Sequence, residues 1–174
     1  MCHNQDLNTG MLLEDRYHGP YNKLLNYALM DDSFTFFVSP QRAAPYACLL
    51  QEDVNPQLCL VVLNQEHKPL LFAEIQVDDW ATEPYTRQQA DARTREQYNQ
   101  LIFDCPIPQL YGLCILGTSL RVYCGDKVTG NLTPDFVDHS KEIPEWDLDI
   151  LSPDGLKKMQ EIVAYIKTEA TKLG

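Results

Sequence analysis

The chain has 174 residues, and 44% of them are hydrophobic, which is enough for one domain with a buried core. This composition excludes a wholly disordered chain, and no apolar run approaches the roughly 18–20 residues that a membrane span needs. The net charge of −11 disfavours nucleic acid as a partner, because phosphate backbones are bound mainly by lysine and arginine.

The first ten residues, MCHNQDLNTG, are polar and lack the apolar segment of a secretory signal. We therefore expect an intracellular protein, cytoplasmic or nuclear and not secreted, whose six cysteines are reduced thiols. The chain has no internal repeat and no linker-like run. We expect a single domain over residues 1–174, with residues 1–11 loose.

The first half of the chain predicts one helix and three strands. A helix is expected to begin at Pro20, which follows Gly19, because proline is favoured at the first helical position, and a weaker helical turn is expected before it, from Met11 to Tyr17. Residues 33–39, 58–63 and 70–77 are rich in aromatic, aliphatic and β-branched side chains and predict strands. The last two strands are separated by a short turn, so we expect them to pair as a hairpin.

The second half predicts a long helix, two strands and a final helix. Residues 82–103 are polar, free of glycine and rich in helix formers, and their arginines are expected on a solvated helix face. Residues 109–116 and 120–124 predict strands. Ser152 and Pro153 predict the start of an amphipathic helix with an apolar stripe that includes Leu156, Met159, Ile166 and Leu173. The order α–β–β–β–α–β–β–α predicts an α+β fold or a three-layer α/β/α fold.

Glu74 is unusual because it lies within an apolar strand, where a carboxylate is costly unless something pairs with it. In a strand it shares one face with Phe72, Gln76 and Asp78. One hypothesis is a polar cluster at one end of the sheet, which adds Gln57 from the paired strand and, less directly, Asp53. The other interpretation is that Glu74 and Gln76 face water on an exposed side of the sheet, and composition alone favours it.

No common catalytic or nucleotide-binding motif is present. The chain has no G-x-S-x-G, P-loop, G-x-G-x-x-G or H-E-x-x-H pattern, and its four histidines show no metal-ligand spacing.

Taken together, the order and spacing of short motifs along the chain resemble a known group. The motifs are Tyr17 to Leu25, Pro40-Gln41, Pro69 to Ile75, Arg87, Ala90-Asp91, Arg95, Pro108 to Gly112, Leu116 to Thr118, and Trp146 to Leu151. The chain resembles a group of proteins from mushroom-forming fungi that look like distant, degenerate members of the PD-(D/E)XK nuclease superfamily. The resemblance spans roughly residues 14–167.

The resemblance implies a restriction-endonuclease-like core with a mixed central sheet, helices on both sides and the order α-β-β-β-α-β. In active members, carboxylates on two strands hold Mg²⁺, and a lysine two residues after the second carboxylate assists the chemistry. Glu74 matches that second carboxylate, and Glu14 loosely matches a helping glutamate of the first helix. This chain departs from the pattern at Gln57, where an aspartate is expected, and at Gln76, where the lysine is expected. Asp53 is a possible substitute metal ligand.

Three functions are therefore open. The first is a degenerate nuclease fold without nuclease activity, whose former active site binds an unknown ligand or a protein. The second is a repurposed site in which Glu74 acts as acid or base on a small organic molecule. The third is a metal-dependent nuclease with a displaced ligand set, so Mg²⁺ is the one cofactor considered. Residues expected around the site are Tyr17, Phe72, Asp78 and Trp80. By analogy, an exposed sheet edge could form a homodimer.

Overall fold

The computed structural model describes residues 11–29, 35–42, 58–135 and 144–173. Within these ranges the elements are, in chain order, α1 (Met11–Leu29), β1 (Phe36–Arg42), β2 (Leu58–Asn64), β3 (Pro69–Gln76), α2 (Asp79–Thr82), α3 (Pro84–Leu101), a 3-10 turn η1 (Ile102–Asp104), β4 (Gln109–Leu116), β5 (Ser119–Asp126), β6 (Leu132–Thr133), β7 (Leu148–Asp149) and α4 (Pro153–Ala170).

The strands that are described form one mixed sheet in the order β1-β2-β3-β4-β5-β6, and the short β7 also pairs with β5. β2 and β3 form the expected antiparallel hairpin, in which Cys59 lies opposite Glu74. β3 and β4 are parallel, with Glu74 opposite Cys114, and α3 lies between them in the chain. β4 and β5 are antiparallel. The expected α+β class is confirmed.

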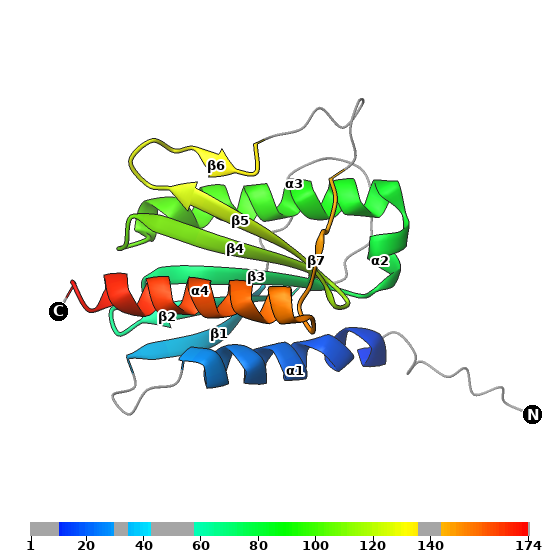
Figure 1. Ribbon diagram of the computed structural model, residues 1–174, viewed down its shortest axis with the longest axis horizontal. Helices are drawn as coiled ribbons and strands as arrows, with labels where there is room; N and C mark the ends of the chain where they lie inside the picture. Colours follow the sequence, from blue (N-terminus) through cyan, green and yellow to red (C-terminus); the bar gives the residue numbers. More distant parts are fainter. Residues whose placement is uncertain (1–10, 30–34, 43–57, 136–143, 174) are drawn as a thin grey trace, which may run out of the picture.

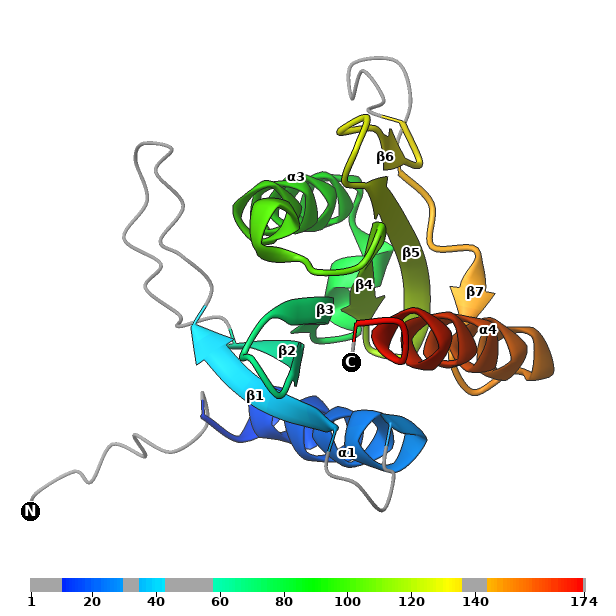
Figure 2. The same cartoon turned by 90° about the vertical axis from the view of Figure 1, so that its left-hand side faces the viewer.

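Helices cover both faces of the sheet. Figure 2 shows α3 on one side of β3, β4 and β5, with α1 and α4 on the other. The apolar core that faces α1 and α4 includes Leu25 of α1 together with Ile162 and Ile166 of α4. The chain therefore places β3 and β4 in the middle of three layers (Figure 1).

Burial on both faces explains the sequence of β3. All eight residues of this strand are buried, as expected for a central strand that helices cover on each side. Alternate residues point to opposite faces, so Leu71, Ala73 and Ile75 lie on the side of α1 and α4. Phe72, Glu74 and Gln76 lie on the side of α3.

Two boundaries in the first half differ from the expectation. α1 begins at Met11 and runs without a break through Pro20, which was expected to start the helix. Proline lacks an N–H but leaves the helix continuous when the neighbouring turns are held by packing, and Tyr21 and Leu25 are buried against the sheet. β1 extends to Arg42 and contains Pro40. Among the described strands β1 pairs only with β2, and a proline is tolerated in a strand at the edge of a sheet.

The final helix, α4, begins where it was expected to, but the face that it buries against the sheet differs from the expected apolar stripe. The Ser152 side chain accepts a hydrogen bond from the Gly155 amide, and Pro153 occupies the first turn. Met159, Ile162 and Ile166 are buried, whereas Leu156 and Leu173, which were expected in the apolar stripe, are about half exposed. The buried stripe is therefore narrower than the sequence pattern indicates.

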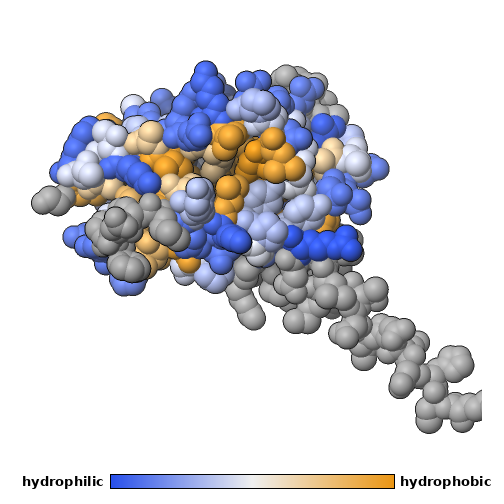
Figure 3. All heavy atoms as spheres, turned by 60° about the horizontal axis from the view of Figure 1, so that its bottom comes forward, coloured by the Kyte–Doolittle hydropathy of each residue, from blue (hydrophilic) through white to orange (hydrophobic). Residues whose placement is uncertain are grey.

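The surface away from α3 is mixed in polarity. In Figure 3, apolar side chains gather near the middle of the face and hydrophilic side chains surround them. No helix within the described ranges has the length and apolar character needed to cross a membrane.

Candidate functional site

Glu74 lies inside the protein and does not face water. Glu74 is 2% exposed to solvent and Gln76 is 5% exposed, because α3 covers this face of the sheet. The interpretation that both side chains point to solvent is wrong. The composition of a single strand does not reveal that a polar helix, with little apolar character of its own, packs over it.

The Glu74 carboxyl group is held by a threonine of α3. The Thr94 hydroxyl oxygen lies 3.1 Å from Glu74 Oε2 and 2.9 Å from the carbonyl oxygen of Ala90, one turn earlier. A hydroxyl has a single proton, so it donates to only one of these acceptors at a time. When Glu74 is protonated, its own proton can go to Thr94, and Thr94 can then donate to Ala90. The neutral carboxyl group therefore completes the chain of hydrogen bonds.

The surroundings of Glu74 favour its neutral form at moderately low pH. Burial raises the pKa of Glu74 from 4.5 to about 7, and the Thr94 hydroxyl and the charge of Arg93 lower it in part. Cys114 is the β4 neighbour of Glu74, and burial raises the pKa of its thiol well above the ordinary value. Cys114 is therefore a neutral thiol at physiological pH, and a carboxyl that titrates near neutrality lies beside it.

Two polar atoms on this face lack hydrogen-bond partners among the described residues. They are Glu74 Oε1 and Gln76 Nε2, and both are buried. Buried polar atoms in folded proteins are nearly always satisfied by protein, water or a bound group. Among the described residues, one oxygen of Glu74 and the amide nitrogen of Gln76 are exceptions to this rule.

Trp80 and Arg93 flank the same end of the site. The Arg93 guanidinium lies 4.9 Å from the centre of the Trp80 ring, a cation–π geometry. Trp80 packs against a small buried group under α3 that includes Cys114 and Leu116. Arg93 Nη1 is also buried without a hydrogen-bond partner among the described residues. Trp80 was expected at the site, and the structure places it beside this cluster.

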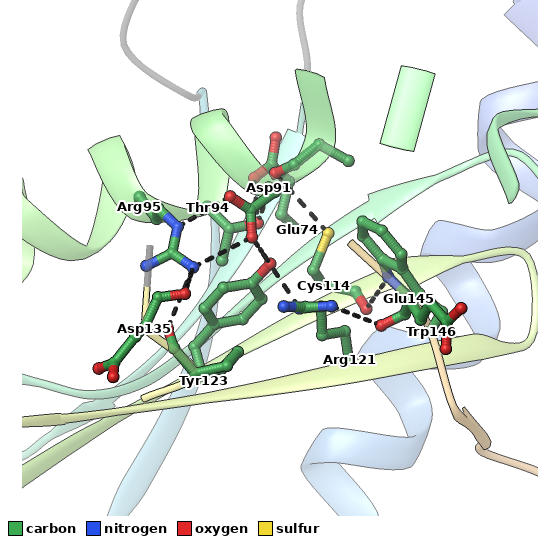
Figure 4. Close-up of polar contacts among 12 residues, drawn as sticks. Glu74, Asp91, Thr94, Arg95, Cys114, Arg121, Tyr123, Asp135, Glu145 and Trp146 are labelled. Atoms are coloured by element: carbon green, nitrogen blue, oxygen red, sulfur yellow. Dashed lines mark hydrogen bonds and ion pairs between the residues drawn. The ribbon is translucent and has the colours of Figure 1, made fainter. Parts of the chain in front are cut away.

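A second polar cluster lies beside the first, around Asp91 of α3 (Figure 4). Asp91 is fully buried and accepts hydrogen bonds from Tyr123 Oη at 2.6 Å and from Arg95 Nε at 2.8 Å. Arg121 Nε of β5 lies 3.9 Å from Asp91 Oδ1. The Arg95 side chain is only 13% exposed. Arg95 was expected on a solvated helix face, but it is paired with Asp91 against the sheet.

The two arginines of this cluster also bind the backbone of later segments. Arg95 Nη2 donates to the carbonyl oxygens of Pro134 and Asp135, at 3.0 and 2.9 Å. Arg121 Nη1 donates to the carbonyl oxygen of Glu145 at 2.6 Å. Asp91 thereby connects α3 to β5 and, through the arginines, to residues that follow β6 and precede β7.

The other expected site residues are distributed over the structure. Phe72 is fully buried, and its ring occupies the space where a side chain at Gly112 would lie, so it is a packing residue. The Tyr17 hydroxyl is hydrogen-bonded to Asp78, and burial together with this carboxylate raises the pKa of Tyr17. α1 packs on the opposite face of the sheet (Figure 2), so Tyr17 does not line the face of Glu74.

Three expected site residues lie outside the described part of the structure. Asp53 and Gln57 fall between the described ranges, and the side chain of Glu14 is likewise not described. Their expected roles as ligands or partners of Glu74 stay predictions.

Of the expected metal ligands, Glu74 is the one whose side chain is described, since Asp53 and the Glu14 side chain are not. No group of three histidine, cysteine, aspartate or glutamate side chains within them is arranged to hold one. Asp91 is the buried acidic residue of α3, and its carboxylate is already bound by Arg95 and Tyr123. Glu74 alone supplies too few oxygen ligands for Mg²⁺.

Sequence reasoning missed Thr94, Arg93, Cys114, Arg121 and Tyr123. A signal did exist on α3, where the buried residues Ala90, Asp91, Thr94, Gln97 and Tyr98 recur at helical spacing. This face is mostly polar, so an apolar-periodicity criterion does not detect it.

Comparison of the chain with protein-family models, with curated proteins and with solved structures found no match in any of the three.

Proposed function

We propose that this chain is a degenerate PD-(D/E)XK-like protein without nuclease activity, in which the face corresponding to the former active site serves for binding. The observation that supports this most directly is at β3. Glu74 stands where the motif has a carboxylate, but Gln76, two residues later on the same face, has no charge to offer a phosphate.

The surroundings of Glu74 support the same proposal. Metal-dependent nucleases need two or more carboxylate oxygens that converge on one or two ions. Among the described side chains, Glu74 is hydrogen-bonded to Thr94. The carboxylate of the neighbouring Asp91 forms ion pairs with Arg95 and Arg121. A lone carboxyl with a pKa of about 7 is a weak metal ligand, because it is partly protonated at neutral pH.

The element order agrees with the family resemblance. α1, β1, β2, β3, α3 and β4 follow one another as the α-β-β-β-α-β core implies, apart from the single-turn α2. The agreement supports the restriction-endonuclease-like assignment as a proposal. Topology alone does not specify activity, because one fold hosts many functions.

A second candidate is a site that transforms a small organic molecule with Glu74 as acid or base. The observation in its favour is the carboxyl group itself, which titrates near neutral pH and has one free oxygen among the described residues. A general acid or base is most effective when its pKa lies near the working pH.

Metal binding and nucleic-acid cleavage test the main proposal together. We expect titration calorimetry with Mg²⁺ and Mn²⁺ to show no micromolar binding. We also expect no cleavage of single- or double-stranded DNA or RNA in the presence of either ion.

The matched control is Glu74→Gln, purified in the same way. Cleavage that occurs equally in both preparations is a contaminating nuclease. Metal binding and cleavage that are present in the natural protein and absent in Glu74→Gln would instead establish the third function, a nuclease with a displaced ligand set.

A further inference from the structure

We propose that α3 is a releasable cover, a helix that leaves the sheet while the layer of α1 and α4 stays folded, and that its release uncovers Glu74 and Gln76. Both residues are almost fully buried beneath α3 (Figure 2), so any binding at their face requires this helix to move first. The role given to the release rests on the proposed binding function. The release itself is measured without any ligand.

The surface that α3 buries is poor in apolar side chains. Its buried residues are Ala90, Asp91, Thr94, Gln97 and Tyr98, and three of these five carry polar or charged groups. On the opposite face of the sheet, α1 and α4 bury large apolar side chains, which include Tyr21, Leu25, Leu29, Met159, Ile162 and Ile166. Buried apolar area is the main force that docks a helix, so α3 is held less firmly than the other two.

Buried polar atoms without hydrogen-bond partners are concentrated in the same layer. Six are found among the described residues, and each belongs to α3 or to the sheet face that α3 covers. They are Arg87 Nε, Arg93 Nη1 and Tyr98 Oη on α3, and Glu74 Oε1, Gln76 Nε2 and Arg121 Nε on the sheet. Such atoms give up water on burial and gain no partner. Their hydration on release therefore offsets part of the contacts that are lost.

The side-chain hydrogen bonds that join α3 to the sheet can be exchanged for water. The Thr94 hydroxyl lies 3.1 Å from Glu74 Oε2, and Tyr123 Oη donates to Asp91 at 2.6 Å. Asp91 also accepts from Arg95 on its own helix, at 2.8 Å. This ion pair leaves the sheet together with α3, so release does not strand the carboxylate without a cation.

Hydrogen exchange on the full-length protein tests the release directly. The amides of residues 88–98 should exchange through an opening at least about tenfold more populated than the opening that exposes the amides of β3 and β4. Low concentrations of urea should affect the α3 opening much less than the strand opening, because it exposes less surface.

Cys114 provides an independent reporter beneath the helix. Its Sγ lies 3.9 Å from the carbonyl oxygen of Ala90, and the residue is fully buried. Iodoacetamide labelling followed by peptide mass spectrometry should modify Cys114 at least about tenfold faster than global unfolding allows.

Two variants separate release of α3 from global unfolding. Thr94→Val removes the hydroxyl beside Glu74 and should accelerate Cys114 labelling about tenfold. Ile162→Val trims the opposite layer, which stays packed in the open state. It should make the strand amides exchange about fivefold faster and leave Cys114 labelling unchanged. Circular dichroism confirms that each variant is folded.

Equal acceleration of Cys114 labelling in both variants would overturn the proposal, because the thiol would then react through global unfolding. A Thr94→Val variant that labels no faster than the natural protein would overturn it too. So would α3 amides that share the opening and the urea dependence of β3 and β4. None of these results affects the nuclease question, which metal titration and cleavage assays answer independently.

Discussion

At the level of single residues, Glu74 makes a prediction about stability and pH. Burial raises its pKa from 4.5 to about 7, so the folded protein holds this proton more tightly than the unfolded chain does. The stabilisation is fully present below about pH 4.5 and is lost as the pH rises through about 7. Glu74→Gln is neutral at every pH and does not lose this stabilisation. As the pH rises from 5 to 8, we therefore expect its free energy of unfolding to increase by about 2.5 kcal/mol relative to that of the natural protein. Urea denaturation at the two pH values measures this difference.

The matched control for this prediction is Glu96→Gln, which makes the same substitution at an exposed position of α3. Its effect on the free energy of unfolding should be nearly the same at pH 5 and pH 8. A Glu74→Gln effect that is equally independent of pH would show that the carboxyl group is not desolvated as described.

The sequence identifies Glu74 but not its environment. A carboxylate within LLFAEIQV is conspicuous by residue type, and strand parity correctly groups it with Phe72 and Gln76. Its burial depends on α3, which covers the strand from a distant part of the chain. Thr94 and Arg93 are ordinary helix residues in the sequence, and only the docking of α3 on β3 brings them to Glu74.

At the level of elements, the ion pairs of Asp91 connect α3 to β5. The side chains of Asp91, Arg95 and Arg121 are 1%, 13% and 11% exposed, so removal of the carboxylate leaves two largely buried guanidinium groups without their anion. We expect Asp91→Ala to lower the free energy of unfolding by about 3 kcal/mol or more. Chemical denaturation measures this value.

Two comparisons locate the source of that loss. Tyr123→Phe removes only the hydroxyl that donates to Asp91 and should cost about 1–2 kcal/mol. Glu161→Ala breaks the exposed pair with Lys158 and should cost less than about 1 kcal/mol. A loss for Asp91→Ala as small as that for Glu161→Ala would contradict a structural role of the buried pair.

The contact between α3 and the end of β5 gives a second prediction for the elements. A side-chain carbon at Gly125 would lie 1.9–2.0 Å from ring atoms of Tyr98, which is 2% exposed. We expect Gly125→Ala to destabilise the protein by about 1–3 kcal/mol, because the ring has to shift. Thermal and urea unfolding measure the change.

The double variant Gly125→Ala/Tyr98→Leu tests the cause. Once the Tyr98 ring is absent, the alanine at position 125 should add little further destabilisation. The loss of unfolding free energy in the double variant should therefore be smaller than the sum of the losses in the two single variants. Strictly additive losses would show that Gly125 is required for its backbone conformation and not for the room that it leaves for Tyr98.

The sequence predicts the elements well where their pattern is local. The β2–β3 hairpin, the strand 109–116 and the Ser152 cap were all expected, since alternation, turn residues and capping are encoded within a few residues. The continuity of α1 through Pro20 and the buried face of α4 were not expected. Tertiary packing carries α1 through Pro20, and it also selects Ile162 over Leu156 for burial.

At the level of the whole molecule, the chain order predicted the layers but not the site between them. The order of helices and strands indicated the α+β class, because a helix between two strands favours a parallel pair that helices cover. The polar clusters combine β3, α3, β4 and β5, which are up to about fifty residues apart in the chain. A single sequence contains no direct information on which of these side chains meet.

The charge of the whole molecule gives the last prediction. The chain carries a net charge of −11, and its densest group of arginines lies on α3. Arg95 is held by Asp91, and Arg93 lies over Trp80, so these cations already have partners within the protein. We expect 20-nucleotide single- and double-stranded DNA to bind more weakly than about 10⁻⁴ M at 150 mM salt, the weak limit of ordinary non-specific binding. Fluorescence anisotropy across a salt series measures this affinity. Micromolar binding that weakens steeply with salt and is lost in Arg87→Gln would contradict the prediction, because it would require a basic surface on α3 that outweighs the net charge.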